Sequence, residues 1–313
     1  MPTSTSFPTA AALRQPERDQ RLRIAVGIAT SGRAAILAET LADLARQTLQ
    51  PHQVFVLYSR DEDIADLEQQ FPSCRFAKGV GGLCEKRNRI LDDACEADLL
   101  FFMDDDFFLD PRYLAVTEEA FRRDRNLVAS TGIVLADGAK GPGLSTEEAT
   151  QVLNKAAASD FVKHSPVAAF NTYGCNMAFR LATVREHSLR FDEQLPAYAW
   201  YEDIDFSRRL AQWGSLMCLP DALGVHLGAK VGRVSGRRLG YSQVANPIYL
   251  SRKGSFPWGN TVRSIGRNVC SNLLWSVLRD PYVDRRGRLR GNLLAFRELL
   301  AGRMHPNRIL RMA

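Results

Sequence analysis

The stretch 99–106, LLFFMDDD, places three aspartates directly after five apolar residues. The apolar run has the length and composition of a buried strand, so the aspartates fall at its carboxyl end. Side chains alternate along an extended segment, and we therefore expect Asp104 and Asp106 to point to one side and Asp105 to the other. Two carboxylates on one side form a hard oxygen site that suits Mg²⁺ or Mn²⁺. The alternative is that the aspartates are only charged residues where the strand ends and a loop begins. Three adjacent carboxylates, however, repel one another unless a cation or hydrogen-bond donors offset their charge.

Strands and helices are predicted to alternate around this stretch. The expected strands cover 23–28, 54–58, a short segment near Phe76 and about 127–135, and the expected helices cover about 36–45, 63–71 and 85–95. This alternation predicts a mostly parallel sheet with helices on both faces. Ligands of such sheets bind beyond the carboxyl ends of the strands. The loops 30–33 and 59–63 and the aspartate run should therefore meet at one edge.

A second acidic pair, Glu202-Asp203, lies at the predicted start of a helix, because apolar residues recur at helical spacing after it. Free backbone N–H groups and the helix dipole stabilise carboxylates at such a position, so helix capping explains the pair without any catalytic role. Asp205 follows on the same helix. It can pair with Arg208 or Arg209, which predicts a structural role for it.

Composition sets limits on the class of protein. The 313 residues are 45% hydrophobic, which is enough for a substantial core. Residues 1–20 are rich in Pro, Ser, Thr and charge and are expected to form a flexible tail without a signal peptide. No apolar stretch approaches the roughly 20 residues of a membrane span. The six cysteines show no CxxC spacing, which favours reduced thiols in the cytoplasm and argues against a structural zinc.

The carboxyl-terminal region differs in charge from the rest of the chain. From Lys230 onward there are 17 Lys and Arg against three acidic residues, a net charge of +14, whereas the preceding residues carry −8. Apolar residues spaced by three and four predict amphipathic helices over 262–277 and 289–300, with Trp258 and Trp275 suited to a headgroup boundary. These helices either pack on the preceding domain or bind an anionic membrane surface, and the two interpretations are compatible. Nucleic-acid binding would also explain the positive charge of this region. The sequence contains no recognisable nucleic-acid-binding motif, so we expect no nucleic-acid partner.

Taken together and in this order, the motifs resemble family-2 inverting glycosyltransferases of the GT-A fold, of the bacterial polysaccharide type. The resemblance covers about residues 23–228. It rests on 30–33 (TSGR), Gly82 with Arg87-Asn88, the DDD run, 173–180 (YGCNMAFR), 191–193 (FDE), Glu202-Asp203 and Val225-His226. It implies a flexible tail over 1–20 and a Rossmann-like, mostly parallel α/β catalytic domain over 21–228. A basic helical region over 229–313 would follow.

The resemblance also implies roles for single residues. Asp203 would be the general base, and its neighbour Glu202 would position the acceptor. Asp104 would contact the metal or the nucleotide ribose, while Asp106 and His226 would ligate the metal. These roles favour catalysis over capping for the acidic pair. Without the resemblance, a lone histidine such as His226 would be taken as a core or surface residue.

A further set of residues would contact the nucleotide-sugar. The family often carries acidic, Gly and Ser residues directly after the second strand, and this chain departs from that pattern with the loop 59–63, SRDED. Asp61 is the expected substitute, and the nucleobase stays open among UDP-, GDP- and dTDP-sugars. The predicted nucleotide-sugar contacts are Thr30, Arg33, Asp61, Arg87, Asn88, Asp104 and Asp105.

The function implied is metal-assisted transfer of one sugar from a nucleotide-diphosphate donor to the hydroxyl of a glycan or lipid-linked acceptor. Cell-envelope or exopolysaccharide synthesis is the expected setting, in the cytoplasm or peripherally on the inner face of the plasma membrane. One alternative is a sugar-phosphate nucleotidyltransferase, which usually has a glycine-rich loop after the first strand, where this chain has only Gly32. The other is a catalytically inactive, membrane-associated scaffold, and the intact acidic motifs argue against it.

Overall fold

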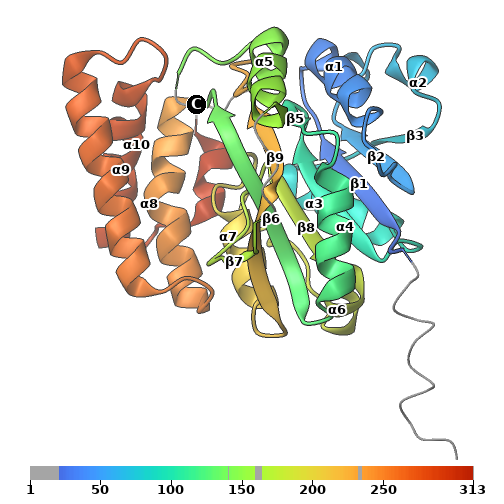
Figure 1. The fold of residues 1–313 in the computed structure, drawn as a ribbon. Coiled ribbons are helices and arrows are strands. Elements are labelled where there is room, and N and C mark those ends of the chain that lie inside the picture. The colour runs from blue at the N-terminus through green and yellow to red at the C-terminus, as the bar shows by residue number, and fades with distance from the viewer. Residues whose placement is uncertain (1–20, 140, 159–163, 232–234, 313) are drawn as a thin grey trace, which may run out of the picture.

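A nine-stranded sheet forms the centre of the computed structural model, which describes residues 21–139, 141–158, 164–231 and 235–312 (Figure 1). The predicted flexible tail, 1–20, lies outside the described residues. The order of the strands is β3-β2-β1-β4-β8-β6-β9-β5, with β7 beside β9. The strands are β1 (Ile24–Ala29), β2 (Gln53–Tyr58), β3 (Cys74–Lys78), β4 (Leu99–Asp104), β5 (Phe107–Leu109), β6 (Leu127–Asp137), β7 (Val167–Ala168), β8 (Asn176–Arg180) and β9 (Ser215–His226).

The sheet is parallel on one side and mixed on the other. β3, β2, β1 and β4 run parallel, as the alternation of strands and helices predicts. β8 then runs antiparallel to both β4 and β6, while β6 and β9 are parallel to each other and β5 pairs antiparallel with β9. The carboxyl ends of β1, β4, β6 and β9 therefore meet at one edge of the sheet, which is the edge predicted to bind ligands.

Helices cover both faces of the sheet. The alternation of side chains along β4 explains this arrangement, because Leu100 and Phe102 pack into one apolar cluster and Phe101 and Met103 into the other. α3 and α7 supply side chains to the first cluster, and α1 and α4 to the second. The helices before the carboxyl-terminal region are α1 (Ala34–Leu44), α2 (Leu67–Gln70), α3 (Leu83–Asp93), α4 (Tyr113–Arg123), α5 (Thr146–Ala157), α6 (Leu181–Glu186) and α7 (Glu202–Leu210).

One predicted helix is wrong in its extent. In place of a continuous helix over 63–71, the structure has a 3₁₀ turn, η1 (Asp61–Asp63), and the four-residue α2. The Asp63 carboxylate accepts hydrogen bonds from the backbone N–H groups of Ser59 and Arg60, at 3.0 and 2.8 Å. Ala65 then takes a positive φ of 47°. A short acidic side chain that bonds to nearby backbone competes with helix formation, and here it holds a turn instead.

Three long helices form the carboxyl-terminal region: α8 (Gly236–Lys253), α9 (Trp258–Leu278) and α10 (Arg285–Leu300), followed by the short η2 (Pro306–Arg311). The two predicted amphipathic segments lie in α9 and α10, and α8 is an addition to that prediction. α8 and α10 approach closely at glycines, since a Cβ atom on Gly240 would lie 2.0 Å from the backbone oxygen of Arg288. The helices also contact the preceding domain. Asn246 donates to the backbone oxygen of Trp200 at 2.8 Å, and Lys253 donates to Asp205 at 2.9 Å.

Candidate active site

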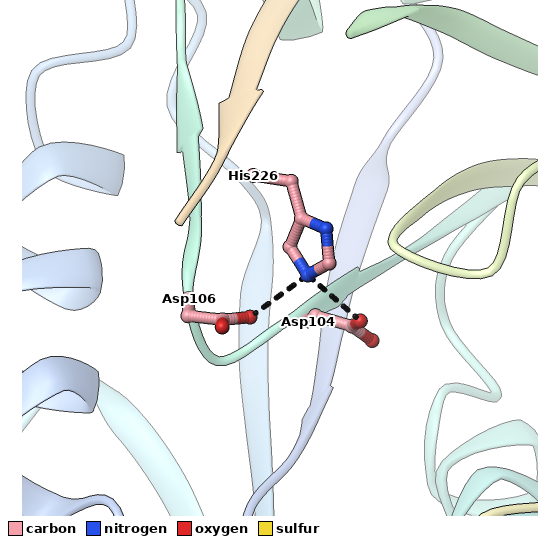
Figure 2. Close-up of side chains that lie close together, drawn as sticks. All are labelled: Asp104, Asp106 and His226. Atoms are coloured by element: carbon pink, nitrogen blue, oxygen red, sulfur yellow. Dashed lines mark ion pairs between the residues drawn. The ribbon is translucent and has the colours of Figure 1, made fainter. Parts of the chain in front are cut away.

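Two aspartates of the acidic run share a site with one histidine. Asp104 ends β4 and Asp106 lies just before β5, whose pairing with β9 sets Phe107 opposite His226. His226 Nε2 lies 3.3 Å from Asp106 Oδ1 and 3.8 Å from Asp104 Oδ2 (Figure 2). One ligand atom from each of the three residues lies within 4.8 Å of the others. Sheet pairing thus brings together side chains that are more than a hundred positions apart in the sequence.

Asp105 points away from this cluster, as the alternation of side chains predicts. Its carboxylate accepts hydrogen bonds from Thr30 Oγ1 at 2.6 Å and from the Arg33 guanidinium at 2.7 Å. Burial raises the pKa of Asp105, and the positive charge of Arg33 opposes that rise. The loop after β1 and the acidic run therefore meet, and Asp105 holds Thr30 and Arg33 beside the cluster.

The cluster fits a divalent cation. Asp106 Oδ2 accepts a hydrogen bond from the Ala229 N–H at 2.7 Å. Its Oδ1 is buried and forms the 3.3 Å ion pair with His226 Nε2, which leaves it capacity for a cation. Burial raises the pKa of Asp104 to about 7, with the charge of Asp106 adding to the rise and that of His226 opposing it. Two carboxylates and an imidazole suit Mg²⁺ or Mn²⁺. Asp104, Asp106 and His226 would hold the ion.

Asp137 and Tyr173 support His226 and were missed by the sequence reasoning. Asp137 Oδ1 lies 2.9 Å from His226 Nδ1, and the Tyr173 hydroxyl donates to Asp137 Oδ2 at 2.9 Å. Burial lowers the pKa of His226, but its bonds to Asp106 and Asp137 outweigh burial and raise that pKa to about 10. A carboxylate on the second ring nitrogen fixes which nitrogen faces a metal. The position of Asp137 at the carboxyl end of a predicted strand was the signal that could have identified it.

Arg87 joins the metal cluster to the second acidic pair. It is buried in α3 and forms an ion pair with Glu202, and its NH2 donates to the backbone oxygen of Gly174 at 2.8 Å. The same NH2 lies 3.7 Å from Asp104 Oδ1. Glu202 is itself only 6% exposed. The capping explanation does not hold for Glu202, because its carboxylate pairs with Arg87. Its predicted contact with an acceptor stays a prediction.

Asp203 lies on the other side of this ion pair, at the start of α7. The helix begins where the sequence predicts, and Asp205 pairs with Arg209 on it as expected. Asp203 Oδ2 accepts from the Gly174 N–H at 3.1 Å. Burial raises the pKa of Asp203 to about 8, and the charge of Glu202 adds to the rise. A carboxyl group with a pKa near neutrality is a suitable acceptor for a proton.

Two predicted nucleotide-sugar contacts, Asn88 and Asp61, have their own partners outside the acidic cluster, and their contact with a nucleotide-sugar stays a prediction. The Asn88 side chain is buried and exchanges hydrogen bonds with the backbone of Phe191, at 2.8 and 3.0 Å, so it fastens α3 to that segment. The Asp61 side chain is 81% exposed and pairs with Lys78. The neighbouring Asp63 is the buried acid of this loop, and it accepts from the Gly32 N–H at 2.7 Å. Within this short loop the Asp61 side chain points to solvent and the Asp63 side chain points into the protein, and the sequence did not show which of the two would be buried.

The sheet order and the acidic cluster at the ends of β4 and β9 agree with a GT-A fold. The sequence matches no family model and no curated protein. Two solved structures show the likeness. The first is GalNAc-T7 with UDP, GalNAc and Mn²⁺, at 16% identity and a TM-score of 0.54, covering 78% of this chain and 54% of that one. The second is the mannosyltransferase PcManGT from Pyrobaculum calidifontis in complex with GDP-Man and Mn²⁺, at 15% identity and a TM-score of 0.54, covering 94% and 79%.

These likenesses confirm the predicted fold. At 15–16% identity they establish architecture, and chemistry has to be argued from the residues of this chain. The chain spans about half the length of GalNAc-T7 and about four fifths of the length of PcManGT.

Proposed function

We propose that this chain is a metal-dependent glycosyltransferase that moves one sugar from a nucleotide-diphosphate donor to an acceptor hydroxyl. One observation carries the proposal. The carboxylate–histidine cluster, which suits a cation, lies beside the buried Arg87, which pairs with Glu202, and the next residue, Asp203, has a carboxyl group with a raised pKa. Sugar transfer needs both parts, one for the charge of the departing diphosphate and one for the proton of the attacking hydroxyl. The two similar structures, one with UDP, GalNAc and Mn²⁺ and the other with GDP-Man and Mn²⁺, support this choice.

The residues of the chain divide the chemistry between them. When bound, Mn²⁺ or Mg²⁺ would stabilise the negative charge that develops on the diphosphate. Asp203 would take the proton from the acceptor hydroxyl. The hydroxyl oxygen forms a bond to the anomeric carbon while the bond from that carbon to the phosphate oxygen breaks, and the diphosphate leaves with the electron pair. Attack from the side of Asp203, opposite the leaving group, inverts the anomeric configuration.

Arg87 and Glu202 would position these parts. A buried guanidinium that touches Asp104 and Glu202 fixes the distance between the cation site and the start of α7. Thr30 and Arg33 lie beside the cluster, where a nucleotide would be bound. We propose a UDP-, GDP- or dTDP-sugar as donor and a glycan or lipid-linked acceptor. Cell-envelope or exopolysaccharide synthesis is the setting, at the inner face of the plasma membrane.

Thermal unfolding with a panel of nucleotide-sugars, with and without Mn²⁺ or Mg²⁺, tests the proposal. A donor that binds the native chain raises the unfolding midpoint, and the rise should require the metal. Asp106→Ala should abolish this metal-dependent rise. Asp203→Asn should keep it but release nucleoside diphosphate at least about 100-fold more slowly, since a positioned base contributes that much.

The exposed Asp66 provides a matched control, because Asp66→Asn makes the same chemical change on the surface and should leave both readouts unchanged. Near-normal turnover in Asp203→Asn would show that the assigned base is wrong. No metal-dependent rise with any nucleotide-sugar would reject the proposed function.

A further inference from the structure

Helix α9 turns small and polar side chains, together with the partly buried Ile265 and Val269, toward the protein, and it exposes most of its other apolar side chains to solvent. Its buried residues are Thr261, Ser264, Asn272 and Ser276, all small or polar. The opposite side of the helix, in its carboxyl-terminal half, is almost entirely apolar. We call the exposed apolar side of the helix the α9 outer face. It comprises Val262 (69% exposed) near the amino end and, in the carboxyl-terminal half, the exposed Cys270, Leu273 (55%), Leu274 (56%), Val277 (73%) and Leu278 (58%).

Hydrogen bonds hold the helix in this orientation. Ser264 bonds to the hydroxyl of Tyr201, directly before the acidic pair at the start of α7. Asn272 donates to Gln243 of α8 at 2.8 Å and to Asn292 of α10 at 2.9 Å. Rotating the helix to bury its leucines would leave these polar groups without partners, at a cost in stability for each stranded group. The apolar surface is thus a fixed feature of the fold.

The charges around the α9 outer face are positive. Arg263 and Arg267 are exposed on the same helix, and Arg279 and Arg286 are exposed at the turn between α9 and α10. Each of the three acidic residues after Lys230 is already engaged. Asp280 pairs with Arg285, Asp284 caps α10 and Glu298 pairs with Arg308. A second copy packed face to face would set arginines against arginines, whereas a layer of anionic headgroups complements both the charge and the apolar surface.

Aromatic side chains extend the apolar surface. Trp258 and Trp275 are 54% and 43% exposed, and Tyr282 in the turn between α9 and α10 is 53% exposed. Trp and Tyr combine an apolar ring with a polar group and favour the boundary between headgroups and acyl chains. No helix among the described residues is long and apolar enough to cross a membrane. An amphipathic helix of this kind lies in the plane of the interface.

The α9 outer face ends near the catalytic edge of the sheet. Ala229 contacts Asp106, and α8 begins seven residues later at Gly236, where a Cβ atom would lie 2.4 Å from Asp284 in the turn before α10. The carboxyl end of α9 and this turn are therefore at the same end of the molecule as the acidic cluster. Figure 1 shows this end at the top, where the tip of β6 and the turn between α9 and α10 both lie.

We propose that the α9 outer face, with the turn 279–284, docks on an anionic lipid bilayer as an interfacial helix. Docking places the catalytic edge close to the membrane surface. The docking follows from the surface of α9 alone. Its consequence, that the acceptor hydroxyl is carried on a membrane lipid, rests on the proposed function.

Vesicle flotation with the full chain tests the docking. The chain should float with vesicles of phosphatidylcholine and phosphatidylglycerol, and much less with phosphatidylcholine alone or in high salt. Leu274→Glu with Val277→Glu should weaken binding by about tenfold or more for each side chain, because each removes apolar area from the interface. Val167→Glu is the matched control, since Val167 is 59% exposed on β7, and it should bind as the unchanged chain does. Equal unfolding midpoints would show that the variants are folded.

Charge reversal separates the two parts of the interaction. Arg263→Glu with Arg267→Glu should weaken binding to anionic vesicles by at least about fivefold per arginine. Sedimentation of the chain without vesicles tests whether the α9 outer face binds a second copy of the chain instead of a membrane. A concentration-dependent dimer that Leu274→Glu disperses, together with an absence of flotation, would overturn the proposal and assign the face to a second copy.

A fluorophore on Cys270 reports the depth of the contact. Cys95 is the other exposed cysteine, so Cys95→Ser directs a polarity-sensitive thiol probe to Cys270. Its emission should shift to shorter wavelength with anionic vesicles, while the same probe on Cys95 in Cys270→Ser should not shift. An unshifted Cys270 probe would contradict insertion of this face.

The nucleotide-sugar panel keeps the two proposals apart. Metal-dependent donor binding without flotation rejects the docking alone. Flotation without donor binding rejects the proposed function and its lipid-linked acceptor, and leaves the docking surface in place.

Discussion

Replacing Asp137 by asparagine should weaken the binding of Mn²⁺ by about 10–100-fold, which corresponds to about 1.4–2.7 kcal/mol. Asp137 lies 2.9 Å from His226 Nδ1, on the side of the ring away from Asp104 and Asp106, so the variant leaves all three proposed ligands in place. It removes the negative charge that makes the imidazole a better donor and fixes its orientation. Titration of free Mn²⁺ by electron paramagnetic resonance measures the affinity directly, without any sugar substrate.

Tyr173→Phe provides a graded comparison. It removes one hydrogen bond to Asp137, at 2.9 Å, and keeps the carboxylate, so about 1 kcal/mol or roughly fivefold in affinity is expected. The affinity for Mn²⁺ should therefore be highest in the unchanged chain and fall in the order Tyr173→Phe, Asp137→Asn, His226→Ala. If Asp137→Asn binds Mn²⁺ as tightly as the unchanged chain while His226→Ala does not, the carboxylate behind the histidine has no role in metal binding. If His226→Ala also binds normally, His226 is not a ligand.

Three further predictions concern stability and can be measured by urea unfolding. In a chelator, the raised pKa of His226 should contribute on the order of 5 kcal/mol of stability that is fully present below its unfolded pKa of about 6.5 and lost as pH rises through about 10. His226→Gln should remove this pH dependence, and equal curves of stability against pH would refute it. Asp63→Ala should cost about 2 kcal/mol because it removes the acceptor of three part-buried backbone N–H groups, whereas the exposed Asp61→Ala should change stability by less than about 0.5 kcal/mol. Gly291→Ala should cost at least about 2 kcal/mol, since its Cβ would lie 2.1 Å from a backbone oxygen of α8, while Gly266→Ala, with open space around it, should gain up to about 1 kcal/mol; similar effects of the two would contradict the close packing of α8 and α10.

Local patterns predicted much of the fold and one half of the site. The apolar run before Asp104 specified a buried strand, and alternation along it set Asp105 apart from its two neighbours, as the structure shows. The start of α7 at Glu202 followed from helical spacing. These features depend on residues close together in the chain, where backbone geometry leaves few choices. The prediction of a continuous helix over 63–71 was wrong, and the cause was also local. The Asp63 side chain bonds to the nearby backbone and holds a turn, which outweighs the helical spacing of the apolar residues.

The sequence by itself determined five of the strands, β1 to β4 and β6, together with the alternation within the acidic run and the excess of positive charge after Lys230. Only the tertiary structure decided that Arg87 pairs with Glu202, that Asp137 supports His226 and that Asp63 rather than Asp61 turns inward. It also decided that α9 faces outward with its leucines, since apolar spacing alone predicts a helix buried on its apolar side. Each of these choices depends on partners brought together by strand pairing or helix packing, and no spacing along the chain records which partner a buried charge or a polar helix face will meet.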